Sequence, residues 1–82
     1  MNSANIPIRR VVEMALGANA TSVVLAHNHP SGLALPSADD IQTTLRVAAA
    51  LETVEISLAD HIVVCGDDYI SMAQSRYFTP GR

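Results

Sequence analysis

The stretch of sequence that decides the fold is residues 21–30, which read Thr-Ser-Val-Val-Leu-Ala-His-Asn-His-Pro. The first six residues form a continuous β-branched and apolar run, which predicts a strand buried on both faces. Residues 27–36 contain two prolines and one glycine, so we expect a loop there. The strand therefore leads directly into a loop that begins with His27, Asn28 and His29.

Helical patterns lie on both sides of this strand. Before it, apolar residues recur at the i, i+3, i+4, i+7 and i+8 positions of an amphipathic helix. They are Ile8, Val11, Val12, Ala15 and Leu16. Pro7 is a start signal for this helix, and Gly17 or Asn19 can end it. After the strand, Ser37 opens a second helix. Its predicted buried face consists of Ile41, Leu45, Ala48 and Leu51.

Two further apolar segments follow the second helix. Ile56 and Leu58 alternate with polar residues, and residues 62–65 are continuously apolar. Residues 66–68 read Gly-Asp-Asp and favour a turn, so residues 69–72 can return as the second strand of a hairpin. The order helix, strand, helix, strand, strand predicts an α/β fold.

The composition fits one small globular domain. The chain has 82 residues, of which 49% are hydrophobic and 16% charged, and this is too apolar for a disordered segment. Its apolar runs are far shorter than the roughly 20 residues that a membrane-spanning helix needs. The single cysteine excludes an internal disulfide and predicts a cytoplasmic location. A net charge of −3, with Arg9-Arg10 as the one basic pair, argues against direct nucleic-acid binding.

Four polar residues around the predicted loop suggest a metal site. In an extended chain His27 and His29 point to the same side, so both imidazoles can face one point. Ser37 follows after seven intervening residues, and Asp40 lies three residues further on, in the first turn of the second helix. Two imidazoles and a carboxylate are the three protein ligands of a catalytic zinc site, which leaves the fourth position for water. Zinc lowers the pKa of that water to about 7.

Each half of this pattern also has a purely structural interpretation. A His-x-His pair often lies in a loop without binding metal. Ser37 and Asp40 have the spacing of a capping box, in which each residue satisfies a backbone N–H of the other. The two interpretations of Ser37 and Asp40 are compatible, and the joint pattern is far rarer than its parts.

The joint pattern resembles the JAMM metalloprotease motif of JAB/MPN domains, His-x-His-x7-Ser-x-x-Asp. Three strings in order resemble the bacterial RadC-like branch, whose members are named DNA repair proteins: residues 27–32, residues 36–40, and residues 60–64 (Asp-His-Ile-Val-Val). This resemblance implies a cytidine-deaminase-like mixed sheet flanked by two helices. It also implies one zinc per chain on His27, His29 and Asp40, with Ser37 stabilising an oxyanion, and hydrolysis of amide or isopeptide bonds in a peptide or protein substrate.

The general-base glutamate of the family matches no residue of this chain. In the family it lies on a strand upstream of the first matched helix, so residues 1–82 resemble a single partial RadC-like JAB domain without its N-terminal strands. Glu13 is the nearest acidic residue and matches nothing in the motif, which makes it a solvated helix charge. Loss of a general base typically costs 10²–10⁴-fold in rate, so the isolated chain is expected to be inactive.

Three hypotheses follow from the resemblance and the missing glutamate. The chain is a zinc hydrolase domain, a catalytically inactive metal-binding or protein-interaction module, or a structural fragment whose open sheet edge pairs with another copy. The last predicts a homodimer or larger oligomer. Asp60, His61 and Asn28 are candidates for supporting contacts around the metal. Alternatively, Asp60 and His61 stabilise the turn beside the start of their strand, and Asn28 stabilises its own loop.

Overall fold

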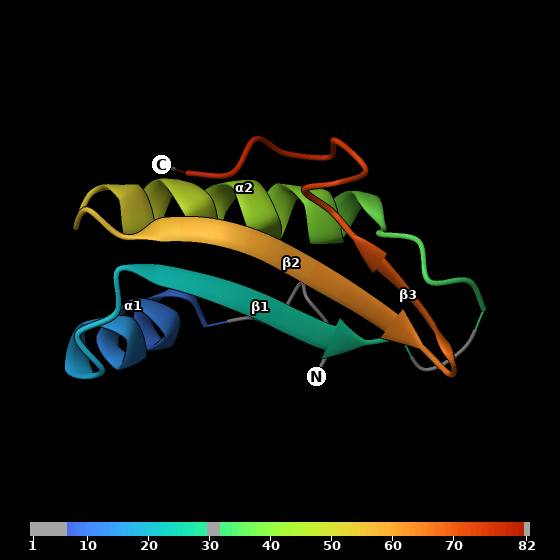
Figure 1. The fold of residues 1–82 in the computed structure, drawn as a ribbon, viewed down its shortest axis with the longest axis horizontal. Coiled ribbons are helices and arrows are strands. Elements are labelled where there is room, and N and C mark those ends of the chain that lie inside the picture. The colour runs from blue at the N-terminus through green and yellow to red at the C-terminus, as the bar shows by residue number, and fades with distance from the viewer. Residues whose placement is uncertain (1–6, 30–31, 82) are drawn as a thin grey trace.

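The computed structural model describes residues 7–29 and 32–81, and its elements follow the predicted order. Figure 1 shows helix α1 (Ile8–Gly17), strand β1 (Ser22–Asn28), helix α2 (Ala38–Glu52), strand β2 (Ser57–Cys65) and strand β3 (Asp68–Ser71). The predicted α/β class and element order are confirmed. Pro30 and Ser31, which belong to the first matched string, lie outside the described residues.

The three strands form one mixed sheet in the order β1-β2-β3. β1 and β2 are parallel, and α2 is the crossover that a parallel pair requires. β2 and β3 are antiparallel and form a hairpin. Its turn contains Gly66 at a φ of 60°, a left-handed conformation that glycine adopts without steric cost. The mixed sheet that the resemblance implied is confirmed.

Helix α1 packs one face against the rest of the domain. Ala15 is buried, and Ile8, Val11 and Val12 pack against the core as predicted. Leu16 is 54% exposed, so the prediction that it belongs to the buried face is wrong. The helix ends at Gly17, one of the two predicted stops.

Helix α2 presents a different face to the core from the one predicted. Its buried residues are Asp40, Thr44, Val47 and Leu51, whereas Leu45 is 51% exposed. The prediction is therefore wrong for Leu45 and right for Leu51, with Ile41 and Ala48 partly buried beside the stripe. Apolar periodicity misplaced this face because two of the inward positions are polar residues, which are buried only when they find hydrogen-bond partners.

The core lies between α2 and one face of the sheet. Val47 and Leu51 of α2 meet Leu58 and Val63 of β2, and all four are at most 1% exposed. The chain after β3 adds Met72 and Phe78 to this cluster. Because α2 packs directly on β2, the first turn of the helix is held near the ends of the strands.

Strand β1 is an edge strand of the described sheet and is buried on one face. Val23, Leu25 and His27 are half-buried, whereas Val24 and Ala26 are exposed, Val24 by 59%. The prediction of burial on both faces is therefore wrong, because among residues 7–29 and 32–81 the packing elements cover only the inner face. The strand also continues through His27 and Asn28, which the sequence had suggested were in the loop.

Candidate metal centre

Strand β1 and the residue that follows it place two imidazoles at the same end of the sheet. His27 is on its inward-facing register, and its side chain is only 7% exposed. The backbone N–H of His29 donates to the carbonyl of Val64 at 2.7 Å, which extends the pairing with β2 past the end of the strand. This extended backbone turns both rings to one side, as predicted, with centroids 4.9 Å apart.

Helix α2 supplies the carboxylate from its first turn. The backbone N–H of Ser37 donates to Asp40 Oδ2 at 2.7 Å, and the backbone N–H of Asp40 donates to Ser37 Oγ at 3.1 Å. This is the capping box that the spacing predicted. It holds the Asp40 carboxylate in a fixed position, and Asp40 as a whole is 1% exposed.

The three predicted ligands converge. His29 Nε2 lies 2.9 Å from Asp40 Oδ2, and His27 Nε2 lies 3.3 Å from Asp40 Oδ1. One ligand atom from each of His27, His29 and Asp40 lies within 4.8 Å of the others, close enough to hold a common cation. Imidazole nitrogen and carboxylate oxygen are both common ligands of zinc.

One buried atom at this cluster tests whether these residues fit a cation. His27 Nε2 is buried and has no hydrogen-bond partner among the described residues, because its contact with Asp40 lacks hydrogen-bond geometry. Buried polar atoms are nearly always satisfied, so an orphan of this kind needs an explanation. A cation bound between the three side chains would satisfy it, so the residues present fit a metal ion.

Two of the three residues, His27 and Asp40, have the ionisation states of metal ligands. Burial lowers the pKa of His27 below its usual 6.5, partly offset by the negative charge of Asp40. Burial raises the pKa of Asp40, but hydrogen bonds from the Ser37 backbone and from His29 outweigh it, so the pKa of this carboxyl lies below its usual 3.8. At neutral pH His27 is therefore a neutral imidazole and Asp40 a carboxylate, the forms that ligate metals.

A third imidazole, that of His61 on β2, lies against His27. His61 is fully buried, and its Nε2 lies 2.9 Å from His27 Nδ1. Its Nδ1 lies 2.6 Å from the hydroxyl of Thr44 on α2. Burial is the largest cause that lowers the pKa of His61 to about 4, so this ring is neutral at physiological pH. The structure thus places His61 in direct contact with a predicted ligand.

Thr44 is a site residue that the sequence reasoning missed. It is fully buried and lies four residues after Asp40, so it is one helical turn further along the same face of α2. The spacing could have identified it, because a threonine four residues after a predicted metal ligand lies on the same helix face as that ligand. Because the apolar pattern assigned that face elsewhere, the spacing was overlooked.

The other candidate residues lie at different positions. Asp60 accepts hydrogen bonds from the backbone N–H groups of His61 at 2.7 Å and Ala73 at 3.0 Å, and from the Ser71 hydroxyl. Neighbouring strand residues point to opposite faces, so its carboxylate points away from the face that His61 shares with Thr44. Asn28 is exposed at the end of β1. Asp60 thus lies within β2 and stabilises the turn that follows β3, not the predicted turn beside the start of its own strand, whereas His61 lies beside the ligands.

Glu13 lies on an exposed surface of α1. Its carboxylate is 3.7 Å from Arg9 Nε, one helical turn away, and the glutamate side chain is 63% exposed. This is the geometry of a solvated intrahelical ion pair, as the sequence predicted. Glu13 is not part of the cluster formed by His27, His29 and Asp40.

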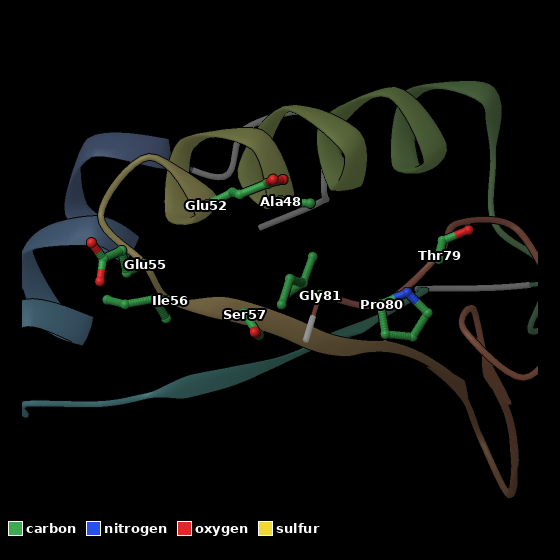
Figure 2. Close-up of a pocket in the computed structure, with 9 residues that line it drawn as sticks. Ala48, Glu52, Glu55, Ile56, Ser57, Thr79, Pro80 and Gly81 are labelled. Carbon is green, nitrogen blue, oxygen red and sulfur yellow. The ribbon is translucent and has the colours of Figure 1, made fainter.

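A cavity of about 670 Å³ opens at the opposite end of α2 (Figure 2). Glu52 of α2 and Glu55 of the following turn line one side, and the C-terminal segment at residues 79–81 lines another. Glu52 is twelve residues beyond Asp40, which is about 18 Å along a helix. The predicted site residues do not line this cavity, so it is separate from the candidate metal centre.

Neither described helix could span a membrane, since neither is long and apolar enough for that role.

The fold and cluster together define an α/β domain with a His/His/Asp site at the end of a parallel strand pair. Comparison with known proteins agrees: the sequence profile of the RadC-like JAB domain matches residues 1–77. The chain belongs to the RadC-like JAB domain family, as the resemblance predicted.

Curated relatives extend this result. A UPF0758 protein of Cellvibrio japonicus is 47% identical over 74 residues, and one of Actinobacillus succinogenes is 46% identical over 74 residues. The match covers 90% of this chain in both, but only 33% and 34% of the relatives. The chain therefore spans about a third of the length of the curated relatives it matches.

Proposed function

We propose that this domain binds one zinc ion through His27, His29 and Asp40 and serves as the metal centre of an amide- or isopeptide-bond hydrolase. The observation that carries the proposal is the buried and unpaired His27 Nε2, which faces the Asp40 carboxylate within a cluster whose ligand atoms lie within 4.8 Å of one another. Family membership supports the same assignment.

The ligands of this site have distinct roles. When bound, zinc would polarise the scissile carbonyl and lower the pKa of a coordinated water towards 7. His27 and His29 would contribute neutral nitrogen ligands, and Asp40 would contribute the charge that favours a divalent cation over water. The capping box fixes the angle of the Asp40 carboxylate before the metal arrives.

Ser37 is the proposed oxyanion-stabilising residue. It is exposed at the N-cap of α2, so it can face a substrate, while its Oγ accepts from the backbone N–H of Asp40. Its hydroxyl hydrogen is then free to be donated to a developing negative charge, a contribution worth about 3 kcal/mol in other hydrolases.

Zinc content is the first test of this proposal. Protein purified without added metal should carry about one zinc per chain by elemental analysis, and Asp40→Ala and Asp40→Asn should carry almost none. Asp39→Ala is the matched control, because Asp39 occupies the same first turn but is exposed. Equal zinc in Asp40→Ala and Asp39→Ala, with both variants folded by circular dichroism, would refute the ligand assignment.

The alternative is a metal-binding or protein-interaction module without catalysis. One feature of the site favours it: the single carboxylate of the cluster is already bonded to Ser37 and His29, so it is placed as a ligand and not as a proton acceptor. The zinc-loaded chain and a version extended to the length of its relatives should be compared on isopeptide-linked substrates. Hydrolysis by the extended version alone supports the enzyme, whereas no hydrolysis by either supports the module.

A further inference from the structure

A chain of buried hydrogen bonds connects two of the proposed metal ligands. It runs from His27 Nδ1 to His61 Nε2 at 2.9 Å, and from His61 Nδ1 to Thr44 Oγ1 at 2.6 Å. From Thr44 Oγ1 it continues to the backbone carbonyl of Asp40, also at 2.6 Å. The chain therefore begins on one ligand, crosses from β1 through β2 to α2, and ends on another.

The direction of every bond in this chain follows from its last member. A carbonyl oxygen can only accept, and a threonine hydroxyl has one hydrogen, so Thr44 donates that hydrogen to Asp40. The sulfur of Met72, 3.6 Å away, is a weaker and more distant acceptor. Thr44 Oγ1 must then accept from His61, and His61 Nδ1 carries the ring hydrogen.

The same reasoning extends to the ligand. His61 is fully buried, and no carboxylate of the described residues is hydrogen-bonded to its ring, so nothing would balance the charge of a second ring hydrogen. With its one hydrogen on Nδ1, its Nε2 is a lone pair that can only accept. His27 Nδ1 must therefore carry a hydrogen and donate it. A hydrogen on His27 Nε2 would be buried without an acceptor in hydrogen-bond geometry, so this nitrogen is left as a lone pair that faces the cluster.

We infer that Thr44 and His61 are positioning residues that hold His27 in the Nδ1-protonated tautomer, with its Nε2 lone pair aimed at the cluster before any metal binds. The inference rests on the proposed function for its purpose, because a fixed lone pair matters only if a cation is to occupy the cluster. The partner of the second ring nitrogen determines the tautomer of a metal-binding histidine and increases its basicity.

His29 is held in a different way. Its Nε2 lies 2.9 Å from Asp40 Oδ2, a carboxylate oxygen that can only accept, while its Nδ1 is 3.4 Å from the carbonyl of Leu33. In the metal-free protein, His29 Nε2 therefore carries a hydrogen and donates it to Asp40, although this is the nitrogen that would bind the metal. Of the two imidazoles, only His27 has its ligating nitrogen free in advance.

The test reads tautomers directly in metal-free protein. Long-range ¹H–¹⁵N correlation spectra of ¹⁵N-labelled protein in excess chelator distinguish a protonated from an unprotonated ring nitrogen. We expect the Nδ1-protonated form at both His27 and His61. A hydrogen on Nε2 of His27 would overturn the inference, and this result needs no variant and no metal.

The matched variants are Thr44→Val, Thr44→Ser and Thr43→Val. Valine keeps the shape of Thr44 and removes its hydroxyl, so His61 loses its acceptor and the tautomer of His27 is no longer determined. We expect zinc affinity, measured by competition with a chelating dye, to fall about 10–100-fold in Thr44→Val. Thr44→Ser should restore it to within a few-fold, and Thr43→Val should leave it unchanged.

These measurements separate the inference from the proposed function. If wild-type protein shows the expected tautomers but binds no zinc, the proposed function fails and the arrangement of His27 stands. If it binds zinc but Thr44→Val is no weaker than Thr43→Val, the positioning role is refuted while the metal site stands. If Thr44→Val does not fold, the wild-type tautomers and the Thr44→Ser affinity decide.

Discussion

Acidification should destabilise the metal-free protein between pH 6.5 and pH 4, and the buried His61 is the principal reason. Burial lowers the pKa of His61 from 6.5 to about 4, so the folded protein accepts this proton only near pH 4. In the unfolded chain the same imidazole is protonated near pH 6.5. Between these values the unfolded state binds more protons, so the free energy of unfolding falls as the pH falls.

The size of this effect follows from the pKa difference. A pKa lowered by about 2.5 corresponds to about 3 kcal/mol, at 1.36 kcal/mol for each pKa unit. A domain of this size has a total stability of about 4–12 kcal/mol, at 0.05–0.15 kcal/mol per residue, so the loss is a large fraction. His27 acts in the same direction, because its pKa is also lowered.

The carboxylates act in a lower pH range. Asp40 and Asp60 both have pKa values below the usual 3.8, so their contribution is complete above that value. It is lost only as the pH falls further, through their folded-state pKa values. The change between pH 6.5 and pH 4 therefore reports on the histidines.

Urea denaturation followed by circular dichroism, at half-unit steps from pH 4 to pH 7.5 in excess chelator, measures the effect. The sequence isoelectric point is about 5.3, so reversibility must be checked at each step. His61→Gln removes the main titrating group and should reduce the slope of the profile in this range, leaving the contribution of His27. Equal slopes in wild type and His61→Gln would refute the assignment of the effect to His61.

Three further predictions concern the fold around the site. Asp60→Ala should destabilise the domain by about 3 kcal/mol in urea denaturation, because it leaves the donors of Ser71 and Ala73 unpaired, whereas Asp67→Ala in the exposed hairpin turn should change stability by less than about 0.5 kcal/mol. Ser37→Ala should cost about 1 kcal/mol through loss of the N-cap, and Ser37→Thr should recover most of it; equal stabilities of the three proteins would contradict the capping role. Strand β1 is an edge of the described sheet and should pair with a second copy, so sedimentation should give a mass that rises with concentration, and a constant monomer mass would exclude this.

Local sequence signals predicted the elements and the cluster correctly where they depend on neighbouring residues. The helix stop at Gly17, the hairpin turn near Gly66 and the capping box of Ser37 and Asp40 are all interactions within a few positions of the chain. The convergence of His27 with His29 follows from the alternation of an extended strand. The matched motif then supplied Asp40 as the third member of the cluster.

Burial was predicted less well, because it depends on what packs against each element. The Val-Val-Leu-Ala run at residues 23–26 predicted a strand covered on both faces, but Val24 and Ala26 are exposed since nothing in the described residues covers them. On α2, Leu45 was expected inside and Thr44 was overlooked. A hydrophobic pattern cannot identify a buried threonine, because that burial depends on partners from other parts of the chain.

The sequence by itself determined the α/β class, the element order, the family, and the identity of the three residues that could hold a metal. These follow from periodicity, turn chemistry and a motif, all of which are properties of the order of residues. Only the tertiary structure decided which nitrogen of His27 is free. The two contacts responsible join residues 34 and 17 positions apart, His27 with His61 and Thr44 with His61. The parallel pairing of β1 with β2 brings the first pair within hydrogen-bond distance, and the packing of α2 on β2 brings the second.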